Sequence, residues 1–352
     1  MTIYFFIALA VSVLLTALVR WLATRAHIVD RPDGHRKRHA YPVPLLGGLA
    51  IFAAFWAIMA FLVFCTDEFG KNIHPERLVG VFIGGLLLMA VGFYDDWRGL
   101  SPRVRFLASV VAVLAVIIGG VGLEKITNPF GGVIRLDFWQ VAIGHAGEIS
   151  IVSALLVFFW LLGTMYTTKI LDGLDGLSAG IVFIGAVIIY FLARSPKFFQ
   201  PDVALAALVL AGVCFGFLIF NFHPAKIFLG EGGGLFLGLI LGVLAVIAGG
   251  KIATALLVMA VPIMDLVRVI YLRLKFKQPI FQGDRRHLHF QLLDMGLGHR
   301  QAVLILYLLS FSFGITTLFL QSNEKIAALL FLALLMVALG MWLGREEGAA
   351  KK

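Results

Sequence analysis

Eleven stretches of mostly apolar residues follow one another along the chain, and each is long enough to cross a bilayer as a helix. A transmembrane helix needs about 20 such residues, because backbone polar groups in hydrocarbon must be hydrogen-bonded within the helix. The predicted spans are residues 3–24, 45–65, 78–95, 104–122, 150–168, 174–194, 202–221, 227–247, 252–272, 302–320 and 326–344. The first stretch is too long for a cleaved signal peptide and lacks a small-residue cleavage site, so we predict that it is retained. We therefore predict an all-α polytopic membrane protein of about 11 transmembrane helices, with residues 1–352 as a single integral membrane domain.

The composition agrees with this prediction. Hydrophobic residues make up 61% of the 352 positions and charged residues only 14%, whereas a soluble chain has about a quarter charged residues. Both cysteines, Cys65 and Cys214, lie in apolar runs, which excludes a disulfide framework and a cysteine-based metal site. The net charge of +9 comes without basic stretches interleaved with aromatic residues, so we expect the membrane, and no nucleic acid, as a partner.

The distribution of basic residues predicts how the chain is oriented. With the N-terminus outside, 21 of the 29 Lys and Arg residues fall in segments on the cytoplasmic side, as the positive-inside rule requires. We therefore predict a multi-pass protein of the plasma (inner) membrane with the N-terminus outside and the C-terminus in the cytoplasm. The longest outer connection is 123–149, where alternating residues at 132–138 predict a small β-hairpin.

Acidic residues on the cytoplasmic side stand at the ends of predicted spans, where ionisable groups are costly and usually functional. Asp95 and Asp96 are adjacent, and two such carboxylates repel each other unless a cation lies beside them. Carboxylate oxygens suit Mg²⁺, which commonly binds one or two carboxylates together with substrate phosphates. The alternative is an acidic helix end that is paired with nearby arginines, namely Arg98, Arg103 or Arg105.

Two glycine-rich motifs follow. In the first, Asp172-Gly173-Leu174-Asp175-Gly176, the i, i+3 spacing places both carboxylates on one face if the segment is helical. The second motif is the run from Asn221 to Gly234, which contains Lys226 and, among glycines, Glu231. Its glycines alone are also typical of close helix packing in lipid, but Glu231 favours a functional site.

Two basic motifs complete the set. Residues 30–39 include Arg36, Lys37 and His39 between Asp, Pro and Gly residues, and either bind anionic lipid headgroups or form an ordered loop that grips phosphates. The second motif contains Arg285, His287 and His289, which suit a diphosphate clamp or acid–base group. A zinc site is disfavoured because neither Cys nor an H-E-x-x-H motif accompanies these histidines.

The order of these motifs resembles the polyprenyl-phosphate N-acetylhexosamine-1-phosphate transferases, in the branch that transfers GlcNAc-1-phosphate to undecaprenyl phosphate; phospho-N-acetylmuramoyl-pentapeptide transferase is more distantly similar. The resemblance extends from about Asp30 to Arg300 and rests on the following motifs: Asp30-Arg31-Pro32, Gly47-Gly48, Asp95-Asp96, Asp172-Gly173-x-Asp175-Gly176, Asn221-Phe222 to Gly230, Pro262-x-x-Asp265, and Asp284-Arg285-x-His287-Leu288-His289.

The resemblance implies that the chain transfers a sugar-1-phosphate, GlcNAc-1-phosphate by its branch, from a UDP-sugar to a polyprenyl phosphate, with release of UMP. It implies a cytoplasm-facing site, Mg²⁺ with Mn²⁺ as the alternative ion, and a homodimer as a candidate assembly. The implied catalytic residues are Asp95, Asp96, Asp172, Asp175, His287 and His289. The implied metal ligands are Asp95, Asp96 and Glu231. The implied substrate-binding residues are Arg36, Lys37, His39, Lys169, Asn221, Lys226 and Arg285.

The chain departs from the family pattern at three places. Lys169 stands where an Asn is usual, Glu231 stands where an Asp is usual, with Gly234 in place of a Ser, and Phe290 stands where a second His is common. If the two loops converge, we expect Lys169 and Glu231 to form a salt bridge or to share a phosphate-binding network. The intact Asp95–Asp96 and Asp172–Asp175 pairs favour an active enzyme.

Other functions fit the sequence less well. A transporter of an anionic solute would place ionisable groups near the bilayer midplane and often shows internal repeats, whereas these acids cluster at one interface and no repeat is visible. A lipid phosphatase or kinase would lack the combination of DG-x-DG with His-x-His.

Overall fold

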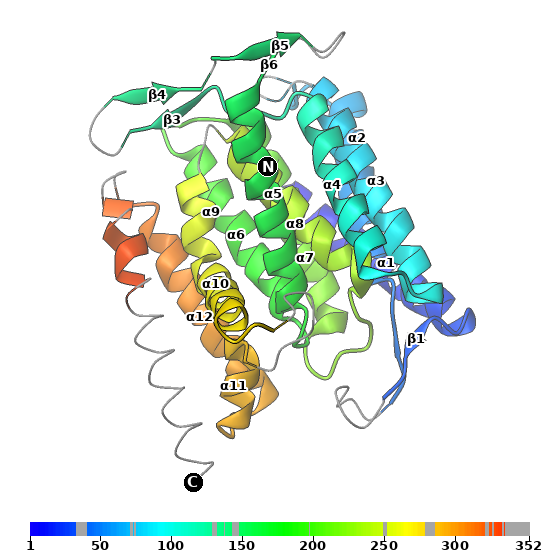
Figure 1. The fold of residues 1–352 in the computed structure, drawn as a ribbon. Helices are drawn as coiled ribbons and strands as arrows, with labels where there is room; N and C mark the ends of the chain where they lie inside the picture. Colours follow the sequence, from blue (N-terminus) through cyan, green and yellow to red (C-terminus); the bar gives the residue numbers. More distant parts are fainter. Residues whose placement is uncertain are drawn as a thin grey trace.

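The fold is a bundle of helices with three two-stranded sheets at its ends (Figure 1). The computed structural model describes residues 1–32, 41–70, 73, 75–128, 132–136, 138–142, 148–196, 198–248, 252–278, 286–320, 324–325, 327–332 and 334. The helices are α1 (Thr2–Arg25), α2 (Gly47–Cys65), α3 (Pro75–Arg98), α4 (Pro102–Ile118), α5 (Ile151–Leu171), α6 (Leu177–Arg194), α7 (Pro201–Asn221), α8 (Gly230–Ile247), α9 (Ile252–Val258), α10 (Ala260–Lys275), α11 (Leu288–Asp294) and α12 (His299–Thr316). The strands are β1 (Val29–Asp30), β2 (Val43–Pro44), β3 (Lys125–Thr127), β4 (Val133–Arg135), β5 (Gln140–Ala142) and β6 (Glu148–Ser150).

Among the described residues, seven helices are long and apolar enough to cross a membrane: α1, α2, α3, α5, α6, α7 and α8. The count becomes eight if the bent pair α9–α10 forms one span. The protein is therefore a multi-pass membrane protein, as the apolar runs predict. The predicted spans at 104–122 and 302–320 correspond to α4 and α12, which do not meet the same criterion. Most of the predicted span at 326–344 lies outside the described residues.

The predicted span 252–272 is not one straight helix. α9 and α10 meet at a bend of 77°. Pro262 is the third residue of α10 and has no N–H to donate to the carbonyl group four residues earlier, which belongs to the last residue of α9. A proline at this position interrupts the helical hydrogen bonding, which explains why the apolar run is broken here.

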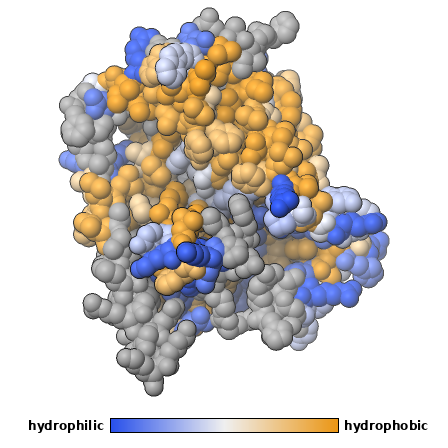
Figure 2. Space-filling model, in the orientation of Figure 1, coloured by the Kyte–Doolittle hydropathy of each residue, from blue (hydrophilic) through white to orange (hydrophobic). Residues whose placement is uncertain are grey.

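The centre of the bundle consists of α6, α7 and α8. Most residues in the apolar stretch of each of these helices are buried inside the protein, up to 89% of them in α8. In α1 only 17% of the residues in this stretch are buried. Figure 2 shows the apolar side chains that cover the middle of one face, with hydrophilic side chains gathered where the helices end. The exposed leucines and phenylalanines of α1 and α4 therefore face the lipid.

Glycines bring the helices that carry the acidic motifs into backbone contact. A Cβ atom added to Gly92 of α3 would lie 2.4 Å from the backbone nitrogen of Gly232 in α8. A Cβ atom on Gly48 of α2 would lie 2.3 Å from the Cα atom of Gly233. The glycine run of α8 thus does serve close helix packing, and it fixes α8 against α2 and α3 beside Glu231.

Two antiparallel hairpins lie at the end of the bundle that is opposite to α11 and β1 (Figure 1). In the first, β3 pairs with β4, with Ile126 opposite Ile134, which confirms the predicted hairpin. The second pairs β5 with β6. At the other end β1 pairs with β2, with Asp30 opposite Val43, and this pairing brings Asp30 to the ends of the central helices.

Candidate active site

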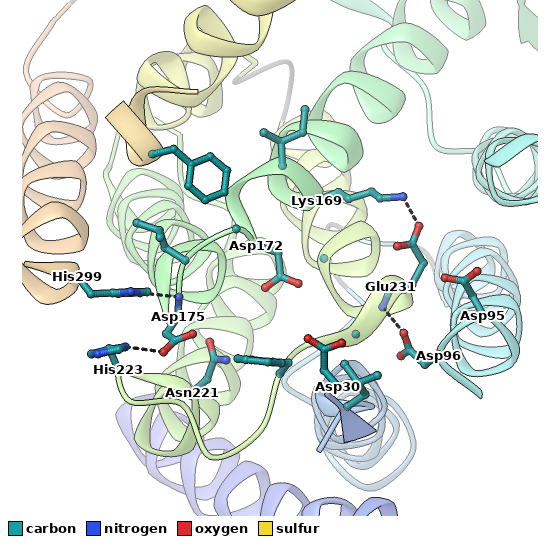
Figure 3. A pocket seen from close by; sticks show the side chains of 18 of the residues that line it. Asp30, Asp95, Asp96, Lys169, Asp172, Asp175, Asn221, His223, Glu231 and His299 are labelled. Carbon is teal, nitrogen blue, oxygen red and sulfur yellow. Dashed lines mark hydrogen bonds and ion pairs between the residues drawn. The ribbon is translucent and has the colours of Figure 1, made fainter. Parts of the chain in front are cut away.

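A cavity of about 740 Å³ opens at the end of the bundle where α3, α5 and α7 finish and α6 and α8 begin (Figure 3). Its lining includes six acidic residues from four separate parts of the chain, namely Asp30, Asp95, Asp96, Asp172, Asp175 and Glu231. The four acidic motifs of the sequence therefore converge in space, although more than 130 residues separate Asp95 from Glu231. The cavity is large enough for a ligand of nucleotide-sugar size.

Asp95 and Asp96 lie in the last turn of α3, which extends to Arg98, three residues beyond the predicted span. One oxygen of Asp95 accepts a hydrogen bond from the backbone N–H of Leu100 at 2.6 Å, and the other lies 3.3 Å from Nη1 of Arg105. Asp96 accepts a hydrogen bond from the backbone N–H of Glu231 at 3.1 Å. Asp95 is thus paired with an arginine, as the alternative interpretation of this helix end predicts. Asp96 instead joins α3 to the first turn of α8.

Glu231 is bound by two cations, and each of its carboxylate oxygens has one. Oε1 forms an ion pair with Nζ of Lys169, and Oε2 lies 3.3 Å from Nη1 of Arg105. The predicted salt bridge between Lys169 and Glu231 is confirmed (Figure 3). Arg105 therefore bridges two acidic motifs, since it contacts Asp95 and Glu231 with the same nitrogen.

Asp172 caps α5 and Asp175 follows in the turn before α6, so the DG-x-DG motif is a tight connection and not a helix. The Asp172 carboxylate makes no hydrogen bond or ion pair within the described part of the chain and points into the cavity (Figure 3). Burial, and then the negative charges of Asp96 and Glu231, raise the pKa of the Asp172 carboxyl group well above its usual range. Concentrated negative charge of this kind is what a bound cation relieves.

The residues fit a divalent magnesium-type ion. The oxygens of Asp96 and Asp172 that have no protein partner within the described residues face the same cavity, and hard carboxylate oxygens are the ligands that Mg²⁺ uses. Neither Cys residue lines the cavity, and the lining histidines His223 and His299 are both bonded to Asp175. In this structure Glu231 and Asp95 are held by Lys169 and Arg105, so their roles as metal ligands stay predictions.

Asp175 belongs to a separate hydrogen-bonded group. Its carboxylate accepts from Nδ1 of His223 at 2.7 Å and from the backbone N–H of Ala225 at 3.1 Å, and its own backbone N–H donates to Nε2 of His299 at 2.9 Å. The two histidine rings stack with their centres 4.0 Å apart. Potential metal-binding atoms of these three residues lie within 4.8 Å of one another, but these hydrogen bonds already use Nε2 of His299 and one oxygen of Asp175.

Asn221 joins the loops around the cavity. Its side chain is buried, its Oδ1 accepts from the backbone N–H of Gly176 at 3.1 Å, and its Nδ2 donates to the carbonyl of Ile227 at 2.9 Å. Both ends of the amide are therefore used to hold the DG-x-DG turn against the loop before α8. Lys226 is exposed and does not line the cavity.

His287 and His289 are buried beside the DG-x-DG turn and do not line the cavity. Nδ1 of His287 lies 2.8 Å from Asp265 in α10. Nε2 of His289 has no hydrogen-bond partner in the described part of the chain, and a Cβ atom on Gly173 would lie 2.7 Å from it. Burial, reinforced by His287, lowers the pKa of His289 to about 4. Their contact with phosphates stays a prediction.

Four predicted substrate-binding residues, Arg36, Lys37, His39 and Arg285, lie outside the described residues. Conversely, the structure reveals neighbours of the site that the list of predicted site residues omits: Asp30, Arg105, His223, Asp265 and His299. Asp265 could have been found, because an acidic residue inside an apolar span is costly and usually functional. Arg105 and His299 carry no such signal, since charged residues at helix starts are common.

Comparisons with known proteins agree with this geometry. The chain matches the family Glycosyl transferase family 4 over residues 78–249, which include three of the four acidic motifs of the cavity, all but that of Asp30. It is 30% identical over 340 residues to a Bacillus subtilis (strain 168) protein named "Probable undecaprenyl-phosphate N-acetylglucosaminyl 1-phosphate transferase", covering 95% of this chain and 88% of that protein.

Two further relatives have similar names. A decaprenyl-phosphate N-acetylglucosaminephosphotransferase of Mycobacterium tuberculosis (strain CDC 1551 / Oshkosh) is 32% identical over 318 residues, covering 83% of this chain and 76% of the relative. An undecaprenyl-phosphate alpha-N-acetylglucosaminyl 1-phosphate transferase of Yersinia pestis is 27% identical over 304 residues, again covering 83% and 76%. With a matching family and a relative of 30% identity over nearly its whole length, the chain belongs to glycosyl transferase family 4, in the branch of the polyprenyl-phosphate N-acetylglucosamine-1-phosphate transferases.

Proposed function

We propose that this protein transfers GlcNAc-1-phosphate from a UDP-sugar to undecaprenyl phosphate and releases UMP, as the first membrane step of cell-envelope glycan synthesis. The observation that carries the proposal is the cavity at one end of the membrane bundle, in which Asp95, Asp96, Asp172 and Glu231 converge. The relatives named above are transferases of this kind. A lipid phosphate is confined to the membrane interface, which explains why the site lies where the helices end.

The chemistry needed is mainly positioning and neutralisation of charge. An oxygen of the lipid phosphate attacks the phosphorus next to the sugar, a new P–O bond forms, and the bond to the UMP oxygen breaks with its electron pair leaving on UMP. The attacking phosphate is already largely ionised, so the reaction does not depend on a strong base. In phosphoryl transfer the protein contributes chiefly by holding the groups in line and by offsetting their negative charge.

Several residues are suited to these tasks. Lys169 and Arg105 bring positive charge to the edge of the cavity, and Asn221 fixes the DG-x-DG turn that lines it. Asp96 and Asp172, with Glu231 as a further candidate, would hold Mg²⁺, or Mn²⁺ in its place. The bound ion would supply charge neutralisation for the two phosphate groups.

We further propose that the cavity faces the cytoplasm across the plasma (inner) membrane. With the N-terminus placed outside, the segments of the sequence that fall on the cytoplasmic side carry 21 of the 29 basic residues, and α3, α5 and α7 end at the cavity on this side. In this orientation a cytosolic UDP-sugar reaches the cavity directly. The finer topology of eleven spans, the cytoplasmic C-terminus and a homodimeric assembly are parts of the same proposal.

The transporter alternative finds no support. Its ionisable groups would lie near the middle of the membrane, whereas the acidic residues here line a cavity at one end of the bundle, and the related proteins are named as transferases.

Release of UMP tests the proposal directly. The purified protein is incubated with undecaprenyl phosphate and a panel of UDP-sugars, with and without Mg²⁺, and UMP is measured together with the lipid product. We expect stoichiometric UMP and lipid-linked sugar phosphate with UDP-GlcNAc, and no release when either the lipid phosphate or Mg²⁺ is omitted. Failure to release UMP with every sugar, from protein that is folded and monodisperse, would contradict the proposal.

A further inference from the structure

We propose that Lys169 is a built-in counter-ion that competes with the divalent cation for Glu231, and so sets how tightly this site binds metal. The inference rests on the metal-binding part of the proposed function and adds a residue whose own charge regulates it. It starts from the finding that both carboxylate oxygens of Glu231 are contacted by cationic side chains of the protein itself.

The two cations differ in how firmly they are placed. Arg105 contacts Asp95 and Glu231 at 3.3 Å each, and a guanidinium group that serves two carboxylates is held from both sides. Lys169 contacts Glu231 alone among the described acidic residues. Its ammonium group sits on a flexible four-carbon stem in the last turn of α5, and about a quarter of the side chain is exposed. Lys169 is therefore the cation that is more easily displaced.

The position of the Lys169 ammonium group determines which oxygens of Glu231 a metal ion can reach. Nζ of Lys169 lies on Oε1 of Glu231, so that oxygen cannot bind a metal ion directly until the lysine moves away. The same positive charge repels any divalent ion placed between Glu231, Asp96 and Asp172, and this repulsion is only partly screened because the Glu231 side chain is 15% exposed. Removing the charge while keeping the aliphatic stem should therefore strengthen metal binding.

The backbone geometry ensures that the effect acts on the metal site and not on a distant surface. The backbone N–H of Glu231 donates to the Asp96 carboxylate at 3.1 Å, so Asp96 lies next to the residue whose charge Lys169 neutralises. Asp96 itself has no cationic partner among the described residues. Figure 3 shows the Lys169 ammonium, the Glu231 carboxylate and the Asp96 carboxylate in succession along one side of the cavity.

Binding of Mn²⁺ provides a readout that is independent of turnover. Free Mn²⁺ is titrated by electron paramagnetic resonance against the purified full-length protein, with neither nucleotide nor lipid phosphate present. We expect Lys169→Met to lower the Kd for Mn²⁺ about tenfold relative to the wild type. Lys169→Arg, which keeps the positive charge, should bind Mn²⁺ as weakly as the wild type does. Lys275→Met removes a lysine from the last turn of α10, outside the cavity lining, and should leave the Kd unchanged.

A second pair of variants tests whether the effect acts through Glu231. In the Glu231→Gln background the competition for Oε1 has been removed and only the repulsion by the lysine charge remains, so Lys169→Met should change the Kd less than it does in the wild type. An unchanged or higher Kd in Lys169→Met, or an equally large decrease in both backgrounds, would overturn the inference, as would absence of Mn²⁺ binding in all of these proteins. Lys169→Gln serves as a second neutral variant if Lys169→Met is not monodisperse. Since no substrate is present, these results are separate from the outcome of the UMP assay.

Discussion

Asp265 in α10 holds His287, which lies 22 residues further along the chain. Nδ1 of His287 lies 2.8 Å from one carboxylate oxygen, and the backbone N–H of Leu288 donates to both oxygens at 3.0 and 3.1 Å. Arg268 lies 3.4 Å from the same carboxylate and also bonds Gln291 of α11 at 2.9 Å. Through these contacts α10 positions α11, which in turn packs beneath the DG-x-DG turn of the cavity.

We therefore expect Asp265→Asn to reduce turnover by about tenfold or more, because small displacements of positioned groups cost that much. The amide retains the size of the carboxylate but no longer offers two acceptor oxygens to His287 and Leu288. The measurement is UMP release with kcat and KM determined separately, since a positioning role should lower kcat more than it raises KM. Glu124→Gln, an exposed change at the opposite end of the bundle, is the matched control. Equal kinetics for Asp265→Asn and this control would contradict the role.

The buried His289 predicts a pH dependence of stability. Burial lowers its pKa from 6.5 to about 4, so between these values the unfolded chain binds a proton that the folded protein does not. Stability should therefore fall as the pH drops from 6.5 towards 4, by on the order of 3 kcal/mol from this residue, which is 3% exposed. Melting temperatures in detergent between pH 4 and 7 should fall less steeply for His289→Leu. Parallel pH profiles would show that His289 is not the residue responsible.

Two glycines of the same region provide a matched pair for a packing test. A Cβ atom on Gly173 would lie 2.7 Å from Nε2 of His289 and 3.2 Å from Phe290, whereas a Cβ atom on Gly163 of α5 would meet nothing within 4 Å. We expect Gly173→Ala to lower the melting temperature and to displace the turn, with loss of most activity. Gly163→Ala should be neutral or stabilising by up to about 1 kcal/mol, because alanine favours helices. Equal tolerance of both changes would argue against close packing of α11 on the turn.

The orientation can be tested with single cysteines at the two ends of the bundle. Val133 in β4 and Met295, which directly follows α11, are exposed, at 56% and 52%. The two elements β4 and α11 lie at opposite ends of the bundle (Figure 1). In a background without Cys65 and Cys214, a membrane-impermeant maleimide added to intact cells should label Val133→Cys and not Met295→Cys. Permeabilised cells should label both. The reverse pattern would place the cavity outside and would rule out a cytosolic nucleotide as the donor.

The adjacent carboxylates of α3 should be indispensable to the reaction. We expect Asp96→Asn to reduce UMP release by about two orders of magnitude or more, as is typical when a group that stabilises transition-state charge is removed. Among the described residues the Asp96 carboxylate makes a single hydrogen bond to the fold, from the backbone N–H of Glu231, so the variant should remain folded and monodisperse. Asp67→Asn, at an exposed position near the end of α2, is the control. Turnover close to that of the control would remove Asp96 from the site.

The sequence predicted the helical bundle and the grouping of the acidic motifs because both depend on local patterns. Apolar length alone identified α1, α2, α3 and α5 to α8, and the Asp pairs and glycine turns marked the helix ends that meet at the cavity. The Lys169–Glu231 pair was also predictable, since a new positive charge and an extended acid appeared together in motifs that were expected to converge. In the structure the pair is a direct contact between Nζ of Lys169 and Oε1 of Glu231.

Other features depend on distances that no local pattern encodes. That Arg105 reaches both Asp95 and Glu231 follows from the packing of α4 and α8 around α3. The link from Asp265 to His287 depends on how α10 leaves the bend at Met259. The stacking of His223 on His299 joins the loop after α7 to the first residue of α12, 76 positions further along the chain, and neither residue stands out in its own segment.

The backbone contact between Gly92 and Gly232 also determines when the cavity can form during synthesis. Asp95 and Asp96 leave the ribosome long before Glu231, whereas Leu100 and Arg105, which bond Asp95 in the folded protein, follow within ten residues. A nascent chain that ends before α8 therefore carries an acidic helix end without an active site. Docking of α8 on α3 then brings Glu231 to these carboxylates, so defects in its docking will destroy the activity of a protein whose earlier helices are correctly inserted.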